Sequence, residues 1–290
     1  MDHIKTVSVI GGDRRLIYAA KRFASLGLQV LSFGLPADGT IQAGSLCEAS
    51  DADILVCGLP FCKDGKTVFA PLADEMIDIN DFCGVLKTGQ TVFAGMPDEN
   101  TAVLLHSGGA DVIDYYKDET LTRINAMLTA EALVGMLITA LPCALTGTEI
   151  AICGFGRIGA ALTEKLRLLG AEVTVFARNE ARRALAEATG VKALPFSAFC
   201  NRCGRYKVLV NTVPAPVIGK EALANLPKDC LLIEAASAPY GIDAAAAEAQ
   251  ELPYISASGL PGKYAPETAG EAIADTVLRL CREVKYNGTS

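Results

Sequence analysis

The sequence has very little histidine and no excess of positive charge. Its 290 residues include only 2 histidines, His3 and His106, and 26 lysines and arginines against 33 acidic residues. The net charge of −7 leaves no basic surface of the kind that binds nucleic acid or an anionic membrane. We therefore expect neither nucleic acid nor a membrane among the partners of this chain.

Metal ligands are scarce as well, although the chain has 10 cysteines. The segment Cys200-Asn201-Arg202-Cys203 has the spacing of half a zinc site, but such a site needs two further ligands. The nearest other pair, Cys57 and Cys62, falls in a different predicted domain. We expect no metal, and we expect reduced thiols that pack as small hydrophobic side chains.

The start of the chain lacks a signal peptide's apolar core, because residues 1–5 lead directly into a strand pattern. This predicts a cytoplasmic protein. The segment 126–145 is apolar and about long enough to cross a bilayer. It contains Glu131 and Pro142 and has no basic flank, so we predict a buried interdomain helix instead.

One glycine-rich turn indicates a dinucleotide site. An apolar strand pattern, 149–153, is followed by the spacing G-x-G-x-x-G and then by a helical pattern, 160–169. In such a turn the first glycine permits the bend, the second lets backbone approach a pyrophosphate, and the third lets helix pack on strand. The helix N-terminus adds N–H groups and partial positive charge for the phosphates. The predicted phosphate site consists of Gly154, Phe155, Gly156, Arg157, Ile158 and Gly159.

The end of the next strand bears on the choice between NAD and NADP. Residues 172–178 form a strand pattern that ends in Arg178-Asn179, with Arg182 and Arg183 close behind. An acidic residue at this point binds the adenosine ribose, whereas a basic residue accommodates the 2′-phosphate of NADP. Arg178 and Asn179 therefore predict NADP as the cofactor. The alternative is that these arginines form only a solvated helix face.

Two further strand ends complete the predicted cofactor site. The buried strand pattern 207–214 leads into a polar turn, which we expect beside the nicotinamide ribose. The strand pattern 231–237 ends in groups that can hydrogen-bond the nicotinamide edge. The residues assigned to the cofactor here are Asn211, Thr212, Val213, Pro214, Ala236 and Ser237.

The N-terminal half repeats the alternation of strands and helices without the full glycine motif. This pattern predicts a second doubly wound domain, one that does not hold a second dinucleotide. Its first strand ends in Gly11-Gly12-Asp13-Arg14, for which two interpretations stay open. The segment is either a turn with a capped helix and no ligand, or a site where the helix start and Arg14 bind a carboxylate.

A long helix, from about residue 119 to 141, connects the two halves and has Glu131 in its apolar middle. A carboxylate in such surroundings has to be paired, protonated or exposed to a cavity. Glu131 is therefore either a satisfied polar contact between domains or an acid or base that faces a cleft.

Together these patterns predict an α/β protein with two Rossmann-like, doubly wound parallel-sheet domains, an interdomain helix and a C-terminal helix that packs back. The predicted boundaries are 1–118 for an N-terminal substrate or partner domain, 119–145 for the interdomain helix, 146–265 for the NADP-binding domain, and 266–290 for the C-terminal helix returning to the first domain.

The order and spacing of several motifs resemble the family of dipicolinate synthase A subunits over nearly the whole chain. The motifs are Gly11-Gly12-Asp13, Glu131 in the long helix, Asn211-Thr212-x-Pro214, Ala236-Ser237, Gly259-Leu260-Pro261-Gly262, Ala265-Pro266 and Thr268-Ala269-Gly270. The chain departs from the family's pattern at Tyr240-Gly241, where Gly-Gly is expected, and at Lys263.

The resemblance implies an enzyme of spore-forming bacteria. It would oxidise a partly reduced pyridine dicarboxylate, the product of dihydrodipicolinate synthase, to dipicolinate with NADP, together with a flavoprotein-like B subunit. In this interpretation Glu131 is a catalytic base and Arg14 binds a substrate carboxylate. We also expect a homo-oligomer. The remaining substrate-binding residues implied by the resemblance are Gly11, Gly12, Asp13, Gly259, Pro261 and Gly262.

Two alternatives stay open at this point. The chain could be an NADP-binding subunit without catalysis of its own, or a different NADP-dependent dehydrogenase of small acids. The sequence shows no His–Asp pair of the hydroxyacid dehydrogenase kind, which argues against simple alcohol oxidation.

Overall fold

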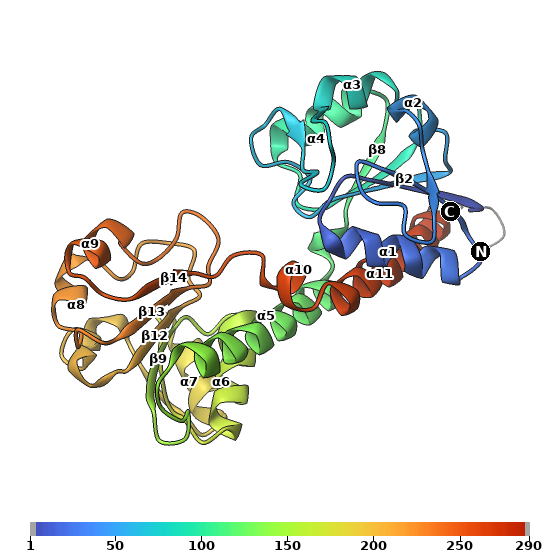
Figure 1. Ribbon diagram of the computed structural model, residues 1–290. Coiled ribbons are helices and arrows are strands. Elements are labelled where there is room, and N and C mark those ends of the chain that lie inside the picture. The colour runs from blue at the N-terminus through green and yellow to red at the C-terminus, as the bar shows by residue number, and fades with distance from the viewer. Residues whose placement is uncertain (1–3, 288–290) are drawn as a thin grey trace. The chain divides into compact units, whose positions relative to one another are not determined.

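The computed structural model describes residues 4–287 and divides into two compact units (Figure 1). Unit 1 consists of Met1–Asn125 and Pro261–Ser290, and unit 2 of Ala126–Leu260. Each unit contains a six-stranded parallel sheet with helices on both faces. The predicted fold class, two Rossmann-like α/β domains, is confirmed.

The sheet of unit 1 starts in its middle and winds outward in both directions, in the order β3-β2-β1-β4-β7-β8. Its strands are β1 (Thr6–Ile10), β2 (Gln29–Phe33), β3 (Ile41–Gln42), β4 (Ile54–Cys57), β7 (Thr91–Ala94) and β8 (Asp111–Asp114). Along β1, Val7 and Val9 join the core on one face, while Ile10 joins the core on the other. This alternation is the period of two that strands impose on their side chains.

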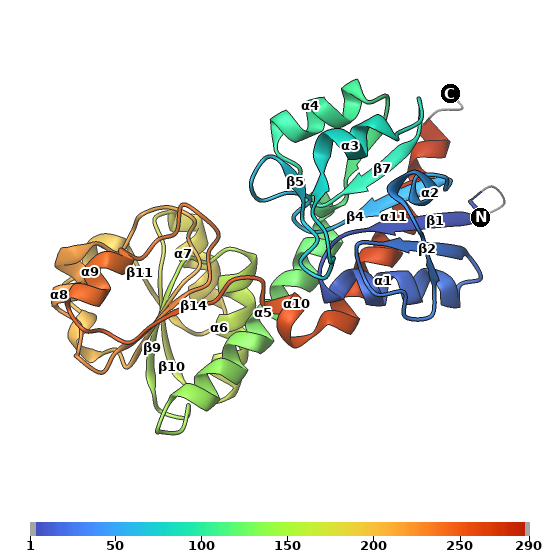
Figure 2. The same ribbon diagram turned by 45° about the horizontal axis from the view of Figure 1, so that its top comes forward.

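Helices cover both faces of this sheet (Figure 2). The first layer is formed by α1 (Arg14–Ser25) and α11 (Pro266–Asn287), and the second by α2 (Leu46–Ala49), α3 (Ile79–Gly84) and α4 (Glu99–Ser107). The C-terminal helix thus packs within the unit that begins the chain, as predicted.

The two helices of the first layer approach each other closely because of one glycine. A Cβ added to Gly270, on α11, would lie 2.2 Å from the carbonyl oxygen of Arg15 and 2.7 Å from Tyr18 Cβ. Beyond this point Ile273 and Val277 enter the same core as α1. Within the motif Thr268-Ala269-Gly270, Gly270 therefore allows α11 to pack closely on α1.

Unit 1 has an insertion that the sequence patterns did not predict. After β4 the chain forms a small antiparallel pair, β5 (Thr67–Val68) and β6 (Ile77–Asp78). The carbonyl oxygen of Phe69 accepts a hydrogen bond from the Gly12 N–H at 2.6 Å. The insertion therefore covers the turn that follows β1, where Gly11 has a φ of +62°.

The sheet of unit 2 has the same winding, in the order β11-β10-β9-β12-β13-β14. Its strands are β9 (Glu149–Cys153), β10 (Glu172–Phe176), β11 (Lys192–Leu194), β12 (Val208–Asn211), β13 (Leu231–Glu234) and β14 (Tyr254–Ser256). One face is covered by α6 (Arg157–Leu168), α7 (Glu180–Ala188) and part of α5 (Glu119–Ala140), the other by α8 (Lys220–Ala224) and α9 (Ala244–Ala249). The remaining elements are three short 3-10 helices, η1 (Tyr115–Lys117), η2 (Phe196–Ala198) and η3 (Cys203–Arg205), and the short helix α10 (Leu260–Tyr264).

Among the described residues, α5 is the one helix long and apolar enough to cross a membrane, by length and composition alone. Leu121 belongs to a core of unit 1, whereas Ala130, Leu133 and Leu137 belong to a core of unit 2. These buried positions are those of a core helix, which passes the same test of length and composition.

We expect Gly270→Ala to lower the free energy of unfolding by about 1–3 kcal/mol, the usual cost of overpacking. The gain in helix propensity from replacing glycine, at most about 1 kcal/mol, is smaller. Urea unfolding followed by circular dichroism measures the difference. The control is Gly84→Ala in α3, where a Cβ would meet no atom within 4 Å. Equal stability of the two variants would contradict the close approach of the helices.

Candidate functional site

A tight glycine turn connects β9 to α6 in unit 2. Gly154 has a φ of +97°, which favours glycine, and its N–H donates to Phe176 O at 2.8 Å. A Cβ on Gly159 would lie 2.3 Å from Gly154 O, whereas a Cβ on Gly156 would meet no atom within 4 Å. The fold therefore requires the first and third glycines, while the second borders open space.

The first turn of α6 is open at its amino end. Gly156 is the N-cap, and no side chain caps the helix there. Phe155 is buried, Ile158 is partly buried and Arg157 is exposed. Backbone N–H groups at a helix start have no partner within the helix and, with the helix dipole, favour an anion. This geometry fits a pyrophosphate.

The cysteine just before the turn is not a reactive group. Burial raises the pKa of the Cys153 thiol far above its usual value, so the thiol stays protonated at neutral pH. Within residues 4–287, no group of three or more His, Cys, Asp or Glu side chains is placed to hold a metal ion.

Arginines gather near the end of β10, beside the glycine turn. Arg178 is exposed, and its carbonyl oxygen accepts a hydrogen bond from Arg183 Nη1 at 2.7 Å. Arg182 Nη1 lies 3.5 Å from Phe155 O in the turn. Asn179, also exposed, caps α7 by accepting from the Arg182 N–H at 3.3 Å. The strand end therefore carries positive charge of the kind that suits a phosphate group.

A buried carboxylate organises the ends of β12 and β13. Glu234 is 1% exposed, and its Oε1 accepts from Asn211 Nδ2 at 2.7 Å and from the Ala236 N–H at 3.0 Å. Its Oε2 accepts from the N–H groups of Gly241 and Ile242 at 2.8 and 2.9 Å. These hydrogen bonds satisfy a carboxylate that would otherwise be costly to bury. Glu234 thereby connects the turn after β12 to the loop after β13.

Gly241 is part of the same arrangement, since a Cβ there would lie 2.3 Å from Asn211 Nδ2. Asn211 Oδ1 also accepts from the Val213 N–H at 3.1 Å, and Thr212 Oγ1 donates to Cys153 O at 2.8 Å. Asn211 is fully buried, so it shapes the turn instead of facing solvent. Among the other predicted cofactor residues here, Pro214 and Ser237 are exposed, Thr212 and Val213 are partly buried, and Ala236 is buried.

The sequence patterns did not single out Glu234. Its one signal is an acidic residue directly after the apolar run Leu231-Leu232-Ile233, with no break in the strand pattern. A charged residue in that place needs several hydrogen-bond donors close by, and those donors come from segments whose proximity the sequence does not reveal.

The glycine turn of unit 1 is closed, unlike that of unit 2. The N–H of Gly11 donates to Phe33 O at 2.8 Å, and the N–H of Gly12 donates to Phe69 O at 2.6 Å. Neither glycine therefore offers its N–H to a ligand. A role of this turn in binding the substrate stays a prediction that depends on its side chains.

A pair of charged side chains stands at the start of α1. Asp13 caps the helix by accepting from the Arg15 N–H at 3.1 Å, and the Arg15 guanidinium binds the same carboxylate at 2.8 Å. Arg15 also donates to Leu59 O. Arg14 is exposed. The capped helix is thus present, and the binding of a carboxylate by Arg14 stays a prediction.

The late glycine motif has a structural role in unit 1. A Cβ on Gly262 would lie 2.8 Å from Asp13 Oδ2 and 3.1 Å from Arg15 Nε. The structure therefore brings Gly262 to the charged pair of α1. Pro261 is buried, and Gly259, with a φ of +65°, is exposed. Binding of substrate by Gly259, Pro261 and Gly262 stays a prediction.

Glu131 does not lie in apolar surroundings, in contrast to the expectation from the sequence. Its side chain is 54% exposed and pairs with Lys165 Nζ, on α6, at 3.0 Å. Although the sequence around Glu131 is apolar, the face of α5 that carries Glu131 is exposed to solvent. The ion pair accounts for the residue, and its role as a base stays a prediction.

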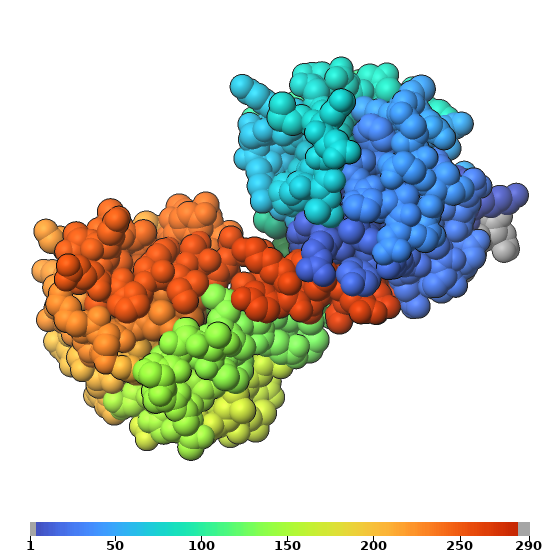
Figure 3. Space-filling model, viewed as in Figure 1, coloured from blue at the N-terminus to red at the C-terminus, as the bar shows by residue number. Residues whose placement is uncertain are grey.

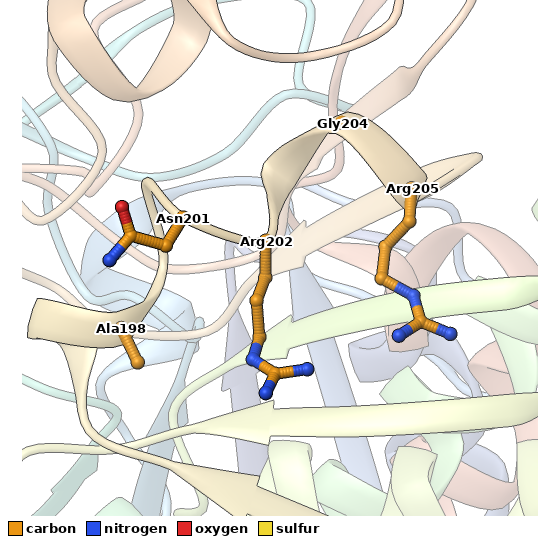
Figure 4. Close-up of a pocket in the computed structure, with 5 residues that line it drawn as sticks. All are labelled: Ala198, Asn201, Arg202, Gly204 and Arg205. Carbon is orange, nitrogen blue, oxygen red and sulfur yellow. The ribbon is translucent and has the colours of Figure 1, made fainter.

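A separate hollow of about 700 Å³ lies beside the η2–η3 segment of unit 2. It is lined by Ala198, Asn201, Arg202, Gly204 and Arg205. The guanidinium groups of both arginines extend to the same side of the segment (Figure 4). Arg205 pairs with Glu149, the first residue of β9, so the hollow lies at the sheet edge opposite the glycine turn. It is therefore no part of the dinucleotide site.

Two family models match the chain, one in each unit. Residues 6–116 match the model of the N-terminal domain of the dipicolinate synthase A subunit. Residues 136–252 match the "D-isomer specific 2-hydroxyacid dehydrogenase, NAD binding domain". The glycine turn lies within the second match, so unit 2 contains a nicotinamide-dinucleotide-binding domain of the dehydrogenase type.

Known proteins agree with these matches. The dipicolinate synthase A subunit of Bacillus subtilis (strain 168) is 26% identical over 222 residues, which are 76% of this chain and 73% of that protein. The crystal structure of the dipicolinate synthase A chain from Bacillus subtilis has a TM-score of 0.86 at 21% identity and covers 99% of both chains. That of the A subunit from Bacillus halodurans has a TM-score of 0.85 at 23% identity, over 95% of this chain and 97% of the other. The predicted resemblance to the dipicolinate synthase A subunit is confirmed.

We expect Glu234→Gln to lower the free energy of unfolding by about 2–3 kcal/mol. The amide nitrogen that replaces one oxygen faces hydrogen-bond donors in either orientation, so at least one of them loses its partner. Chemical denaturation measures the loss, with Glu248→Gln on the exposed side of α9 as the control. If the two variants unfold at the same denaturant concentration, the carboxylate does not hold these loops.

Proposed function

We propose that this chain, a relative of the dipicolinate synthase A subunit, is the NADP-binding subunit of a dipicolinate synthase. The observation that carries the proposal is the glycine turn of unit 2, where Gly156 borders open space at the uncapped start of α6. The chain resembles the dipicolinate synthase A subunit, and its unit 2 matches a dehydrogenase-type domain that contains this turn. Both findings support the assignment of the chain as an oxidoreductase.

The proposed substrate is a partly reduced pyridine dicarboxylate, the product of dihydrodipicolinate synthase. Its conversion to the aromatic dicarboxylate removes one hydride and one proton from the ring. NADP, when bound, supplies the acceptor for the hydride. Aromatisation provides driving force, so the protein mainly has to hold the reacting groups in position.

Residues of this chain have separate tasks in the proposed reaction. The turn from Gly154 to Gly159 holds the phosphates, and Glu234 keeps the neighbouring loops in place. Arg14 binds a substrate carboxylate, which a guanidinium matches with two parallel hydrogen bonds. Glu131 takes the ring proton, a contribution of about 10²–10⁴-fold for a well-placed base.

The choice of NADP over NAD is supported by the charge at the end of β10. Arg178 is exposed there, and Arg182 and Arg183 lie close to its backbone and to the glycine turn. No acidic side chain follows directly on β10, where the ribose of NAD would be bound.

We further propose that a flavoprotein-like B subunit completes the enzyme, in the cytoplasm of a spore-forming bacterium, and that the chain forms a homo-oligomer. Two other functions are compatible with the same turn: a non-catalytic NADP-binding partner subunit, and a different NADP-dependent dehydrogenase of small acids.

An NADP-linked assay of the dihydrodipicolinate synthase product, run with and without the B subunit, tests the function. Formation of NADPH and dipicolinate in the complete mixture supports the proposal, and turnover by the chain alone assigns the catalysis to this chain. NADPH binding without turnover by the chain alone, with turnover only after the B subunit is added, favours the non-catalytic subunit. Turnover of other small acids alone favours the different dehydrogenase.

Gly156→Ala should weaken NADPH binding by about tenfold or more, because a ligand approaching the turn would meet the new methyl group. The fold should change little, since a φ of −84° suits any residue. We expect a change of at most about 1 kcal/mol in the free energy of unfolding. NADPH fluorescence titration measures the affinity. Gly135→Ala, which also meets open space, is the control. Undiminished NADPH binding by Gly156→Ala would remove the turn from the site.

Arg178→Asp should shift the ratio of the NADPH and NADH dissociation constants by about tenfold toward NADH, because it replaces a cation near the 2′-phosphate with an anion. Parallel titrations with the two cofactors measure this ratio. Arg202→Asp makes the same charge change at the opposite edge of the sheet and should leave the ratio unaltered. A ratio that Arg178→Asp does not move would mean that NADP is the wrong cofactor.

A further inference from the structure

Unit 1 has an open groove beyond the carboxyl end of β2. Its volume is about 1080 Å³, and its walls come from the end of β2, the start of α2, the segment 72–78 and α3. On the surface of unit 1 the blue segment near residue 45 and the cyan segment near residue 75 meet (Figure 3). None of the residues assigned to the cofactor or the substrate lines this groove.

The lining combines apolar side chains with acidic ones. Leu35 and Ile77 are buried, whereas Leu72 and Met76 are 37% and 86% exposed. The acidic residues of the lining are Asp74, Glu75, Asp78 and Asp81. Among the described residues that line the groove, none is a lysine, arginine or histidine.

Two of these carboxylates, Asp74 and Glu75, neither cap α3 nor lie in its first turn, where Asp81 is found. Asp78 caps α3 by accepting from the Asn80 N–H at 2.7 Å. The exposed carboxylates of Asp74 and Glu75, in contrast, have no hydrogen-bond or ion-pair partner within residues 4–287. The rim of the groove therefore carries negative charge at these two residues that no ion pair within the described chain neutralises.

This charge excludes the anionic ligands that a doubly wound domain ordinarily binds. A dicarboxylate or a nucleotide phosphate would be repelled by the rim. The turn after β1 cannot compensate, because the N–H groups of Gly11 and Gly12 already donate to Phe33 O and Phe69 O. The lining therefore favours an occupant that is both apolar and positively charged.

The exposed apolar side chains favour a protein segment over a small molecule. The groove is open, and its volume of about 1080 Å³ lies just above the roughly 300–1,000 Å³ of pockets that enclose small ligands. Exposed apolar residues rimmed by polar ones are typical of protein interaction sites. Met76, almost fully exposed, can adapt its unbranched side chain to a partner.

We propose that this groove binds an extended segment of a partner protein in which a lysine or arginine stands next to an apolar residue. The apolar side chain packs on Leu72, Met76 and Ile77, and the cation pairs with Asp74 or Glu75. The site is independent of the reaction proposed above, and it can be tested without cofactor or substrate.

The chain contains no tryptophan, so a peptide with one can be observed without background. The probe is acetyl-Trp-Leu-Lys-Leu-Arg-amide, followed by fluorescence anisotropy as the full chain is added. Two reference peptides carry glutamate in place of lysine and arginine, or serine in place of both leucines. We expect the basic apolar peptide to bind and the two reference peptides to bind at least about tenfold more weakly.

The double variant Asp74→Asn, Glu75→Gln should weaken the basic peptide about fivefold, the effect of two solvent-exposed ion pairs. Met76→Ser should weaken it as well, and circular dichroism verifies that both variants fold. The matched control is Glu99→Gln, Asp111→Asn, which removes the same charge from exposed positions of unit 1 outside the groove. Its binding should equal that of the unchanged chain.

Three results would overturn the proposal. The first is no binding of the basic peptide at millimolar concentration. The second is equal loss of binding in the double variant and in the matched control, which would indicate nonspecific attraction. The third is displacement of the peptide by an equal concentration of arginine amide, which would make the groove a site for small organic cations.

Discussion

A Cβ on Gly159 would lie 2.3 Å from the carbonyl oxygen of Gly154, so α6 can start directly at the end of β9 only while residue 159 lacks a side chain. The same turn is limited from the other side, because a Cβ on Gly154 would lie 2.5 Å from Thr212 Oγ1. Thr212 follows Asn211, whose amide donates to Glu234. A continuous series of contacts thus joins the ends of β9, β12 and β13. The positions of these strand ends depend on the close approach of Gly159 to Gly154.

The two units have the same strand order but differ in whether the helix after the first strand can bind an anion. In unit 2 the start of α6 is uncapped and open, which leaves its N–H groups for an anion. In unit 1 the corresponding helix start is capped by Asp13, and the carbonyl of Phe69 from the inserted pair takes the N–H of Gly12. A shared architecture therefore does not imply a shared ligand, and the difference arises from a few hydrogen bonds at one turn.

The sequence predicted the strongly periodic elements well, because burial of one face leaves a regular pattern in the residues. The strand at 149–153 and the long helix at 119–141 agree with the structure to within a residue. The short β5–β6 pair carries no such pattern, since it is held by contacts with a distant turn. Glu131 illustrates the same limit: its apolar neighbours along the chain suggested burial, yet the helix turns its carboxylate to solvent and to Lys165. Glu234 is the opposite case, a buried carboxylate whose donors come from segments that meet only in the fold.

Unit 1 is assembled from both ends of the chain, with all of unit 2 between its parts. The apolar side of α1, including Leu16 and Phe23, is covered by Ile273 and Val277 of α11. On a ribosome α1 emerges before all of unit 2 and α11 after it, so this core cannot close until unit 2 has been synthesised. During translation the nascent chain must therefore carry an uncovered hydrophobic helix face while the whole dinucleotide-binding unit is being made.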